Sequence, residues 1–386
     1  MSRWFIFIAL FLSVYGSAHL YLLIKIRRAF YLAGVQYVLL FAILTFLLLA
    51  PINARLIEGE GPQWAAVALA WIGFIWLGFV FLFVCQALIV DGYHLIVRAA
   101  QQVFATDWTA IMLSKRQCIN LLALSTCAIM VYGAFEAYHI ETERVTIRSH
   151  KISAASGPVR IVQISDLHIG PLFFPARLAP VIKAVRAAKP DILVSTGDLV
   201  DGRGLRPQAL AAALQSLPAP LGKFAVTGNH EFYAGISMAS DFTRQAGFTL
   251  LRNQPVTVTK DLVIAGVDDP ASHDPDLKAK ERELLKAVPQ NRFCLLLKHR
   301  PRIDADDVAH IDLQLSGHTH RGQIFPFDLL VRLRYPLGYG LRPMAPDRYL
   351  YTSRGTGTWG PPIRVLAPPE ITIIDIVPAD SGADGK

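Results

Sequence analysis

The sequence predicts two parts, a set of membrane-spanning helices followed by a layered α/β domain. Two observations carry this prediction. Residues 1–138 contain four long runs without a formally charged residue, and residues 157–378 alternate short β-branched runs with alanine-rich stretches. Such alternation of strand-like and helix-like segments is typical of α/β folds. The composition agrees, because 53% hydrophobic and 18% charged residues make the chain too apolar for an ordinary soluble protein.

The charge-free runs are each long enough to cross the ~30 Å hydrocarbon core of a bilayer as a helix. Buried helices of a soluble protein would seldom stay uncharged four times in succession. The first run is not followed by a clear cleavage motif, so we interpret it as a retained span rather than a signal peptide. We therefore expect an anchor over residues 1–138, with spans at about 4–24, 29–52, 64–90 and 117–137.

The placement of lysine and arginine predicts an orientation, because loops rich in these residues stay in the cytoplasm. The loop between the second and third spans carries only Arg55, beside two glutamates. The basic loops follow the first and third spans, and their charges are Lys25, Arg27, Arg28, Arg98, Lys115 and Arg116. We therefore expect a multi-pass protein of the cell (inner) membrane, with everything after Tyr138 extracytoplasmic.

The second half of the chain gives the elements of the α/β domain. Residues 139–156 are polar and are interpreted as a connector, and residues 379–386 as a disordered tail. Apolar 3–4 spacing and alanine content predict helices, at Pro175–Ala188, Pro207–Leu217, Met238–Ala246 and Asp276–Ala287. Short β-branched runs predict strands at Val159–Ser165, Ile192–Thr196, Phe224–Thr227, Leu262–Val267, Phe293–Lys298, Ile311–Ser316, Tyr349–Tyr351 and Ile371–Val377.

Polar side chains follow five of these strands, at the point where each strand ends. The five segments are Ser165–His168, Gly197–Asp201, Gly228–Glu231, His299 and Gly317–His320. Open α/β sheets bind ligands beyond the carboxyl ends of their strands, so we expect these segments to meet at one edge. Carboxylate, imidazole and amide groups together suit divalent ions such as Mn²⁺, Fe²⁺ and Zn²⁺. Each histidine taken alone would more often be structural, so the prediction depends on the set.

The order of these segments resembles the calcineurin-like metallophosphoesterase superfamily. The resemblance covers roughly Val159–Val377 and includes "GHTHRGQIFP" and the ending "RGTGTWGPPIRVLAPPEI". That ending is similar to the branch of bacterial phosphodiesterases that includes YaeI and YkuE-type proteins. The resemblance implies a four-layer αββα sandwich, here preceded by four transmembrane helices. It also implies a hydrolase of phosphoric esters that uses two divalent metal ions.

The resemblance further implies a role for each residue of the motifs. Asp166, His168 and His320 would hold one ion, and Asn229, His299 and His318 would hold the second. Asp198 would bridge the two ions as a shared anionic ligand. His230 would bind no metal and would act on the substrate phosphate as a catalytic group.

Three residues near the motifs allow two interpretations each. Arg321 stands where many relatives have glycine, and it would either contact a phosphate or charged headgroup or face solvent. Asp201 would either orient a neighbouring ligand or cap a turn. Glu231 would either fix the tautomer of His230 or lie in solvent, and we favour the latter. The pair Asp268–Asp269 is interpreted as part of a turn.

The stretch Arg321–Arg364 is both basic and apolar, with seven arginines against two aspartates. Such a segment beside an active site favours docking on anionic lipid. The alternative is a buried strand pair with arginines on its wet face. A second apolar loop, "PLFFPARL", follows the first motif at residues 171–178. Nucleic acid is not expected as a partner, because the interleaved side chains are mostly aliphatic rather than a row of stacking rings.

These observations predict a membrane-anchored phosphoesterase that cleaves a phosphodiester or pyrophosphate bond of a lipid or lipid-linked envelope substrate. One alternative is a UDP-2,3-diacylglucosamine-type pyrophosphate hydrolase, which would have to face the cytoplasm. The other is a non-enzymatic membrane-bound binding domain, against which the complete set of ligands argues.

Overall fold

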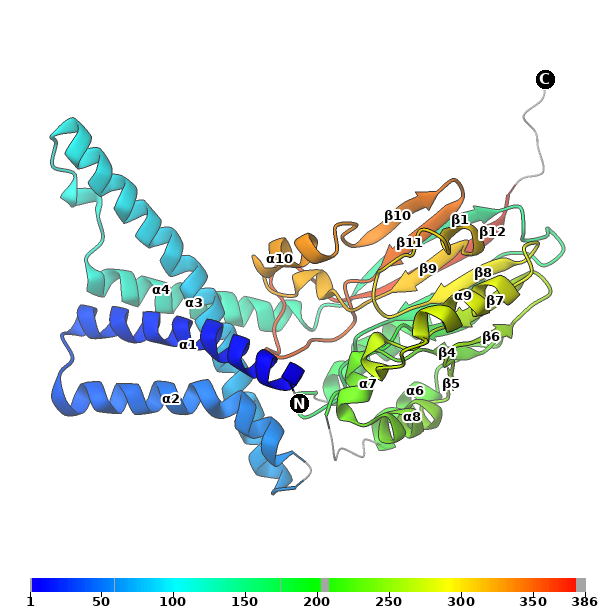
Figure 1. Ribbon diagram of the computed structural model, residues 1–386, viewed down its shortest axis with the longest axis horizontal. Helices are drawn as coiled ribbons and strands as arrows, with labels where there is room; N and C mark the ends of the chain where they lie inside the picture. Colours follow the sequence, from blue (N-terminus) through cyan, green and yellow to red (C-terminus); the bar gives the residue numbers. More distant parts are fainter. Residues whose placement is uncertain (1, 59, 174, 203–207, 380–386) are drawn as a thin grey trace. The chain divides into compact units, whose positions relative to one another are not determined.

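The computed structural model describes residues 2–58, 60–173, 175–202 and 208–379 (Figure 1). The tail after Ala379 and the expected helix start at Pro207 lie outside the described residues. The chain forms two compact units. One contains Met1–Ala134 together with Gly360–Ile363, and the other contains Phe135–Trp359 together with Arg364–Lys386.

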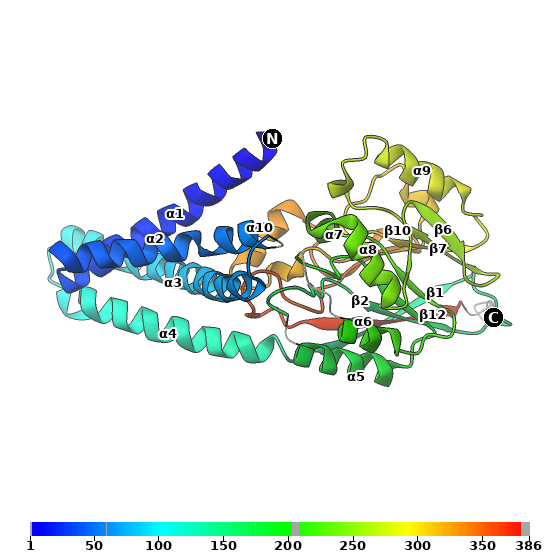
Figure 2. The ribbon, with the colours of Figure 1, turned by 90° about the horizontal axis from the view of Figure 1, so that it is seen from below.

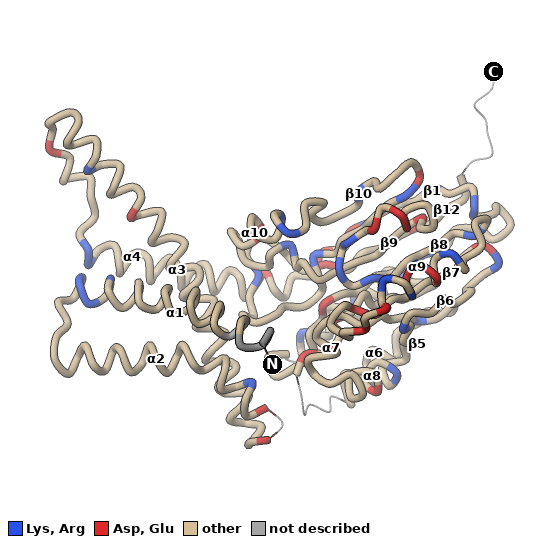
Figure 3. Tube along the Cα trace, viewed as in Figure 1, with Lys and Arg blue, Asp and Glu red and all other residues tan. Residues whose placement is uncertain are grey.

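The first unit is built from four helices that are long and apolar enough to cross a membrane. They are α1 (Ser2–Phe30), α2 (Gly34–Ile57), α3 (Gln63–Phe104) and α4 (Lys115–Glu136), and a short 3₁₀ turn, η1 (Thr109–Ile111), precedes α4. The four predicted spans are therefore confirmed as helices, and charged residues are rare along α1, α2 and α4 (Figure 3). Their shared core contains Leu22, Leu44, Phe83 and Leu122.

Helix α3 is much longer than the expected span of residues 64–90, since it runs for 42 residues. The helix continues past the first charge after that span, Asp91, whose carboxylate has two partners. The carboxylate accepts hydrogen bonds of 2.6 Å from the Tyr21 hydroxyl and 2.7 Å from the Lys25 ammonium. A paired carboxylate is tolerated at this position, whereas an unpaired one would favour leaving the apolar layer.

The second unit contains two six-stranded sheets. The first has the order β1 (Glu141–Ser149), β12 (Glu370–Pro378), β2 (Val159–Ile164), β3 (Ile192–Ser195), β4 (Lys223–Ala225) and β5 (Thr249–Leu250). The second has the order β10 (Gly340–Ala345), β11 (Arg348–Thr352), β9 (Leu313–Ser316), β8 (Phe293–Leu297), β7 (Leu262–Gly266) and β6 (Gln254–Thr257). The neighbours β2, β3 and β4 run parallel, as do β7, β8 and β9.

The two sheets pack face to face and helices cover their outer faces, as Figures 1 and 2 show. Ile161 and Val194 of the first sheet meet Leu295 and Leu315 of the second in the central core. The alternate residues of the first sheet, such as Val162, pack instead on helices α5 (Leu178–Ala188), α6 (Gln208–Gln215) and α8 (Ile236–Gln245). Helix α9 (Leu277–Ala287) covers the second sheet through a separate core. The αββα sandwich is therefore confirmed.

The structure differs from the expectation for residues 139–156, which include strand β1 instead of forming only a connector. This strand pairs in parallel with β12 along its whole length. Its burial alternates, with threonines and arginines on the more exposed face and the glutamates on the other face. Glu141 and Glu143 contact the Arg354 guanidinium at 2.9 Å and 2.6 Å. An edge strand that is half exposed and rich in charged residues lacks the apolar pattern by which the other strands were recognised.

Candidate metal centre

The residues that the sequence predicts as ligands all come from the carboxyl ends of central strands. Asp166 and His168 follow β2, Asp198 follows β3, and Asn229 begins the short helix α7 (Asn229–Ala234) after β4. In the second sheet, His299 follows β8, and the turn with His318 and His320 follows β9. Because these strands are parallel neighbours within two sheets that face each other, the five segments meet at one edge of the sandwich.

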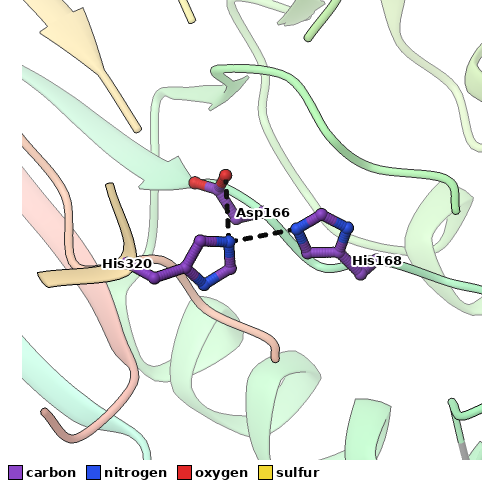
Figure 4. Close-up of side chains that lie close together, drawn as sticks. All are labelled: Asp166, His168 and His320. Carbon is purple, nitrogen blue, oxygen red and sulfur yellow. Dashed lines mark hydrogen bonds and ion pairs between the residues drawn. The ribbon is translucent and has the colours of Figure 1, made fainter. Parts of the chain in front are cut away.

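A first group consists of Asp166, His168 and His320, which are all buried (Figure 4). The Nε2 atom of His320 lies 3.5 Å from Oδ1 of Asp166 and 3.1 Å from Nε2 of His168. Two ring nitrogens and a carboxylate oxygen therefore converge on one point. This is the donor set that the sequence assigns to the first ion.

A second group consists of Asp198, His299 and His318. Nε2 of His299 lies 3.2 Å from Oδ2 of Asp198 and 3.1 Å from Nδ1 of His318. The same Oδ2 atom of Asp198 lies 3.8 Å from Nε2 of His168 in the first group. Asp198 therefore stands between the two groups, where a shared anionic ligand has to be.

Asn229 supplies the observation that best tests whether metal fits here. Its side-chain oxygen is buried and has no hydrogen-bond partner among the described residues. An unpaired buried amide oxygen is costly. The preceding residue, Gly228, is so close to the Asp198 carboxylate that an added Cβ would lie 2.2 Å from Oδ1. The residues of both groups, together with this oxygen, fit divalent cations bound by nitrogen and oxygen ligands.

The backbone of the site is strained at several of the predicted ligands. Five of the predicted ligands adopt left-handed conformations with φ between 48° and 70°, which are unfavourable for residues other than glycine. They are Asp166, His168, Asp198, His318 and His320. Such strain concentrates at functional sites, where the surrounding structure holds the side chains in place.

Two glycines of the motifs are required by close packing. At Gly317 an added Cβ would lie 1.9 Å from the Ser165 hydroxyl oxygen and 2.2 Å from Oδ2 of Asp166. At Gly228 it would meet Asp198, as described above. Neither of these two glycines has a positive φ, so close packing and not backbone conformation requires them. Gly197 does have a positive φ, of 98°.

Burial keeps most of the imidazoles neutral, as metal ligands must be. Burial, together with the nearby His230 ring, lowers the pKa of His168 to about 3. Burial also lowers the pKa of His318 and of His320 well below the ordinary value. His299 is the exception, because Asp198 outweighs the effect of burial and raises its pKa to about 10. Burial raises the pKa of Asp166 to about 6.

Glu231 does not lie in solvent, and that interpretation is wrong. Its side chain is buried, and its carboxylate accepts four backbone N–H hydrogen bonds. Asp198 and Gly228 donate to one oxygen at 3.0 Å and 2.7 Å, and Leu199 and Val200 donate to the other at 2.7 Å and 3.2 Å. Glu231 therefore joins the loops that carry Asp198 and Asn229, which is a supporting role in metal sites.

His230 lies at the edge of the two groups and is held by Asp201. Its Nδ1 atom is 3.0 Å from Oδ1 of Asp201, so of the two interpretations of this aspartate the structure favours the orienting one. The ring of His230 also packs against Tyr233 and Trp359, with centroid distances of 5.4 Å and 6.0 Å. Both of these aromatic side chains are about half exposed. They were not recognised from the sequence, although Trp359 lies within the ending quoted above.

The arginines of the basic stretch Arg321–Arg364 do not all lie on the surface. Arg364 is completely buried and Arg354 nearly so. The Arg364 guanidinium donates to the backbone carbonyls of Gly357, Arg354 and Ala367, and it lies 3.2 Å from Nδ1 of His320. Burial lowers its pKa to about 9. The prediction of a basic surface over this stretch is therefore wrong for Arg354 and Arg364.

Arg321 directly follows His320 and also adopts a left-handed conformation, with φ of 51°. Glycine would adopt this conformation without strain, so arginine is retained here at a conformational cost. Its guanidinium stacks over the Tyr339 ring, 4.2 Å from the centroid. The two aspartates Asp268 and Asp269 pair instead with Arg252 and Arg300, and Asp269 caps the 3₁₀ turn η3 (Pro270–Ser272), as expected for a turn.

Comparison with known proteins identifies the fold around this site. The profile of calcineurin-like phosphoesterases matches residues 159–322. A metallophosphoesterase of Aquifex aeolicus is 41% identical over 248 residues, which cover 64% of this chain and 95% of that protein. The metallophosphoesterase YkuE of Bacillus subtilis is 32% identical over 284 residues, which cover 68% and 98%. The chain belongs to the calcineurin-like metallophosphoesterase family.

As a metallophosphoesterase, the protein is a hydrolase of phosphoric ester bonds, and the resemblance to YkuE-type proteins is confirmed. A transmembrane protein with metallophosphoesterase domain from Danio rerio is 29% identical over 333 residues, covering 81% of this chain and 74% of that protein. That share of the chain is larger than the catalytic unit alone, so the similarity continues into the apolar helices. The similarity of this metallophosphoesterase to a protein named as transmembrane is thus not restricted to the catalytic unit.

Proposed function

We propose that this metallophosphoesterase binds two divalent ions and hydrolyses a phosphodiester or pyrophosphate bond of a lipid or lipid-linked envelope substrate. Asp166, His168 and His320 hold one ion in this proposal. Asn229, His299 and His318 hold the other, and Asp198 bridges them. Bound Mn²⁺, Fe²⁺ or Zn²⁺ would neutralise phosphate oxygens and make water more acidic.

One observation supports the two-ion proposal most directly, which is the position of the Asp198 carboxylate between two groups of buried imidazoles. Its Oδ2 atom lies within 3.8 Å of a ring nitrogen in each group. Burial alone would raise the pKa of Asp198, but His299 and His230 outweigh it and hold the pKa well below the ordinary value. A permanently ionised carboxylate is the ligand that two closely spaced cations need, because it screens their repulsion.

In this proposal, His230 acts on the substrate rather than on metal. Asp201 fixes its ring through Nδ1, and its backbone N–H donates to Oδ1 of Asp198 at 2.8 Å. The ring thus has a defined position beside the proposed ions, from which it can stabilise charge or give a proton to the departing oxygen. Arg321, next to His320, is proposed to contact a phosphate or headgroup oxygen of the substrate.

The surroundings of the site support an amphiphilic substrate. Tyr233 and Trp359, which pack against His230, expose 55% and 48% of their surface. The Tyr335 ring packs against His318 at a centroid distance of 5.6 Å. Aromatic side chains with one exposed face suit a substrate that has both an apolar body and a polar head. The four apolar helices keep the catalytic unit near a bilayer that contains such substrates.

The test is hydrolysis by the full-length protein in detergent, after chelation and with Mn²⁺ restored. We expect activity on bis(4-nitrophenyl) phosphate that disappears on chelation and returns with Mn²⁺. We also expect kcat/KM for a phosphodiester lipid in mixed micelles to exceed that for soluble nucleotides by about ten- to hundredfold, the range that an apolar contact provides. Faster hydrolysis of soluble nucleotides would reject the lipid substrate, and activity that survives complete metal removal would reject the metal site.

The side of the membrane is also part of the proposal. We propose that the catalytic unit is extracytoplasmic in the inner membrane, because the basic residues lie in the last turns of α1, near the end of α3 and at the start of α4, and the positive-inside rule retains these helix ends in the cytoplasm. We expect intact spheroplasts that express the protein to hydrolyse added bis(4-nitrophenyl) phosphate as fast as lysed ones. Activity that appears only after lysis would place the unit in the cytoplasm and favour the UDP-2,3-diacylglucosamine-type alternative.

A further inference from the structure

Helix α10 (Phe327–Arg334) is attached to the turn that carries His318 and His320, and the sequence did not predict it as a helix. The alternative of a buried strand pair is wrong for this segment. At the start of α10, the backbone of Asp328 packs so closely on Gly322 that an added Cβ would lie 2.3 Å from the Asp328 nitrogen. At its end, the Tyr335 ring packs against His318. Both ends of α10 are therefore fixed beside the site.

No residue of α10 is buried, although five of its eight residues are apolar. Leu329, Leu330 and Leu333 are exposed by 56%, 59% and 82%. With 3.6 residues per turn, these three leucines share an arc of about 100° on one face of the helix. The segments on either side add exposed Phe325 and Leu337. A soluble surface seldom carries apolar side chains gathered in this way unless something covers them.

The charges on α10 indicate what covers the leucine face. Arg332 and Arg334 lie on opposite sides of the leucine arc, by the same helical geometry. Asp328 is the only acidic residue of the helix and lies 3.4 Å from Arg332, so the helix keeps a positive excess. Arginines that flank an apolar face extend toward the water side of a membrane interface and attract anionic headgroups. The chain itself carries the helices that keep a bilayer within reach.

We propose that α10 is an interfacial helix, which inserts its leucine face at the boundary between headgroups and acyl chains of an anionic bilayer. The leucines contribute apolar contact, and Arg332 and Arg334 contribute attraction to anionic lipid. Because α10 is fixed at its start to Gly322 and at its end to His318, docking brings the lipid surface to the entrance of the metal centre. The inference does not depend on the substrate, since binding of α10 to lipid is measurable without hydrolysis.

The experiment introduces the photocrosslinker p-benzoylphenylalanine in place of Leu333 in the full-length protein. The variant is reconstituted in nanodiscs of phosphatidylcholine with or without a quarter of phosphatidylglycerol and irradiated. Mass spectrometry then identifies what is attached to residue 333. Lys278 of α9, whose side chain is 92% exposed, is the control position on another helix of the catalytic unit.

We expect lipid adducts at residue 333 and not at residue 278, with a preference for phosphatidylglycerol. The Arg332→Gln and Arg334→Gln variants, which keep the leucine face, should each lower that preference by about fivefold. Circular dichroism and metal content of these variants should equal those of the wild type, which would exclude misfolding. Protein–protein adducts at residue 333 would identify a second copy of the chain as the occupant and overturn the proposal. Absence of lipid adducts at residue 333 would overturn it as well.

Discussion

Replacement of Asp198 by asparagine is expected to lower both the metal content and kcat/KM, the latter by about a thousandfold or more. Asparagine keeps the size of the side chain and the acceptor for the His230 N–H, but it removes the negative charge. Two divalent ions ~4 Å apart repel each other by about 16 kcal/mol at an effective dielectric constant of ~20. Without the shared carboxylate, the second ion should bind poorly and the stabilisation of the transition state by several kcal/mol should be lost.

Elemental analysis of the purified variant measures the first effect, and the chromogenic phosphodiester assay measures the second. Asp268→Asn is the matched control, because Asp268 is also a buried aspartate at a strand end but pairs with Arg252 at 2.8 Å. That variant should lose thermal stability while it keeps its metal and its activity. If Asp198→Asn retained the metal content of the wild type, Asp198 would not be a bridging ligand and the two-ion site would have to be abandoned.

The motif residues were predictable from the sequence because two kinds of signal agree at them. Each lies shortly after a short, mostly apolar run, and parallel strands bring their carboxyl ends to one edge. The runs before Asp166, Asp198 and His299 are fully buried apart from one residue of β2, so burial and pattern coincide. The fold class followed from the same runs and from the four charge-free stretches.

The supporting residues that were not predicted from the sequence contact residues far away in the chain, and such contacts leave no local sequence pattern. Glu231 binds backbone N–H groups some 31 to 33 residues earlier in the chain, and Arg364 reaches His320 across 44 residues. Arginine side chains are mostly exposed in folded proteins, so Arg364 was assigned to the surface although it is buried. Strand β1 and helix α10 share a related difficulty, because both are exposed on one face and neither has a continuous apolar run.

His230 is the residue for which a role as metal ligand most needs to be distinguished from a catalytic role. It lies close enough to His168 and Asp198 to bind a metal ion together with them. We expect His230→Ala to lower kcat by about a hundred- to ten-thousandfold, the range for loss of a general acid or charge-stabilising group. The metal content should stay at the wild-type value, because the other donors remain. Asp201→Asn should give a smaller decrease in kcat, since the amide oxygen can still accept a hydrogen bond from Nδ1 and only the negative charge beside the ring is lost.

Substrates with different leaving groups distinguish the two catalytic roles proposed for His230, which are proton donation and stabilisation of charge. If the imidazole gives a proton to the departing oxygen, His230→Ala should affect an alkyl phosphodiester far more than bis(4-nitrophenyl) phosphate, whose nitrophenolate leaves without protonation. If it only stabilises charge on the phosphate, the two substrates should lose the same factor. A fall in metal content in His230→Ala, measured on the same preparation, would instead make this residue a ligand. Its Nδ1 contact with Asp201 would then be the hydrogen bond that a metal-bound imidazole makes through its other ring nitrogen.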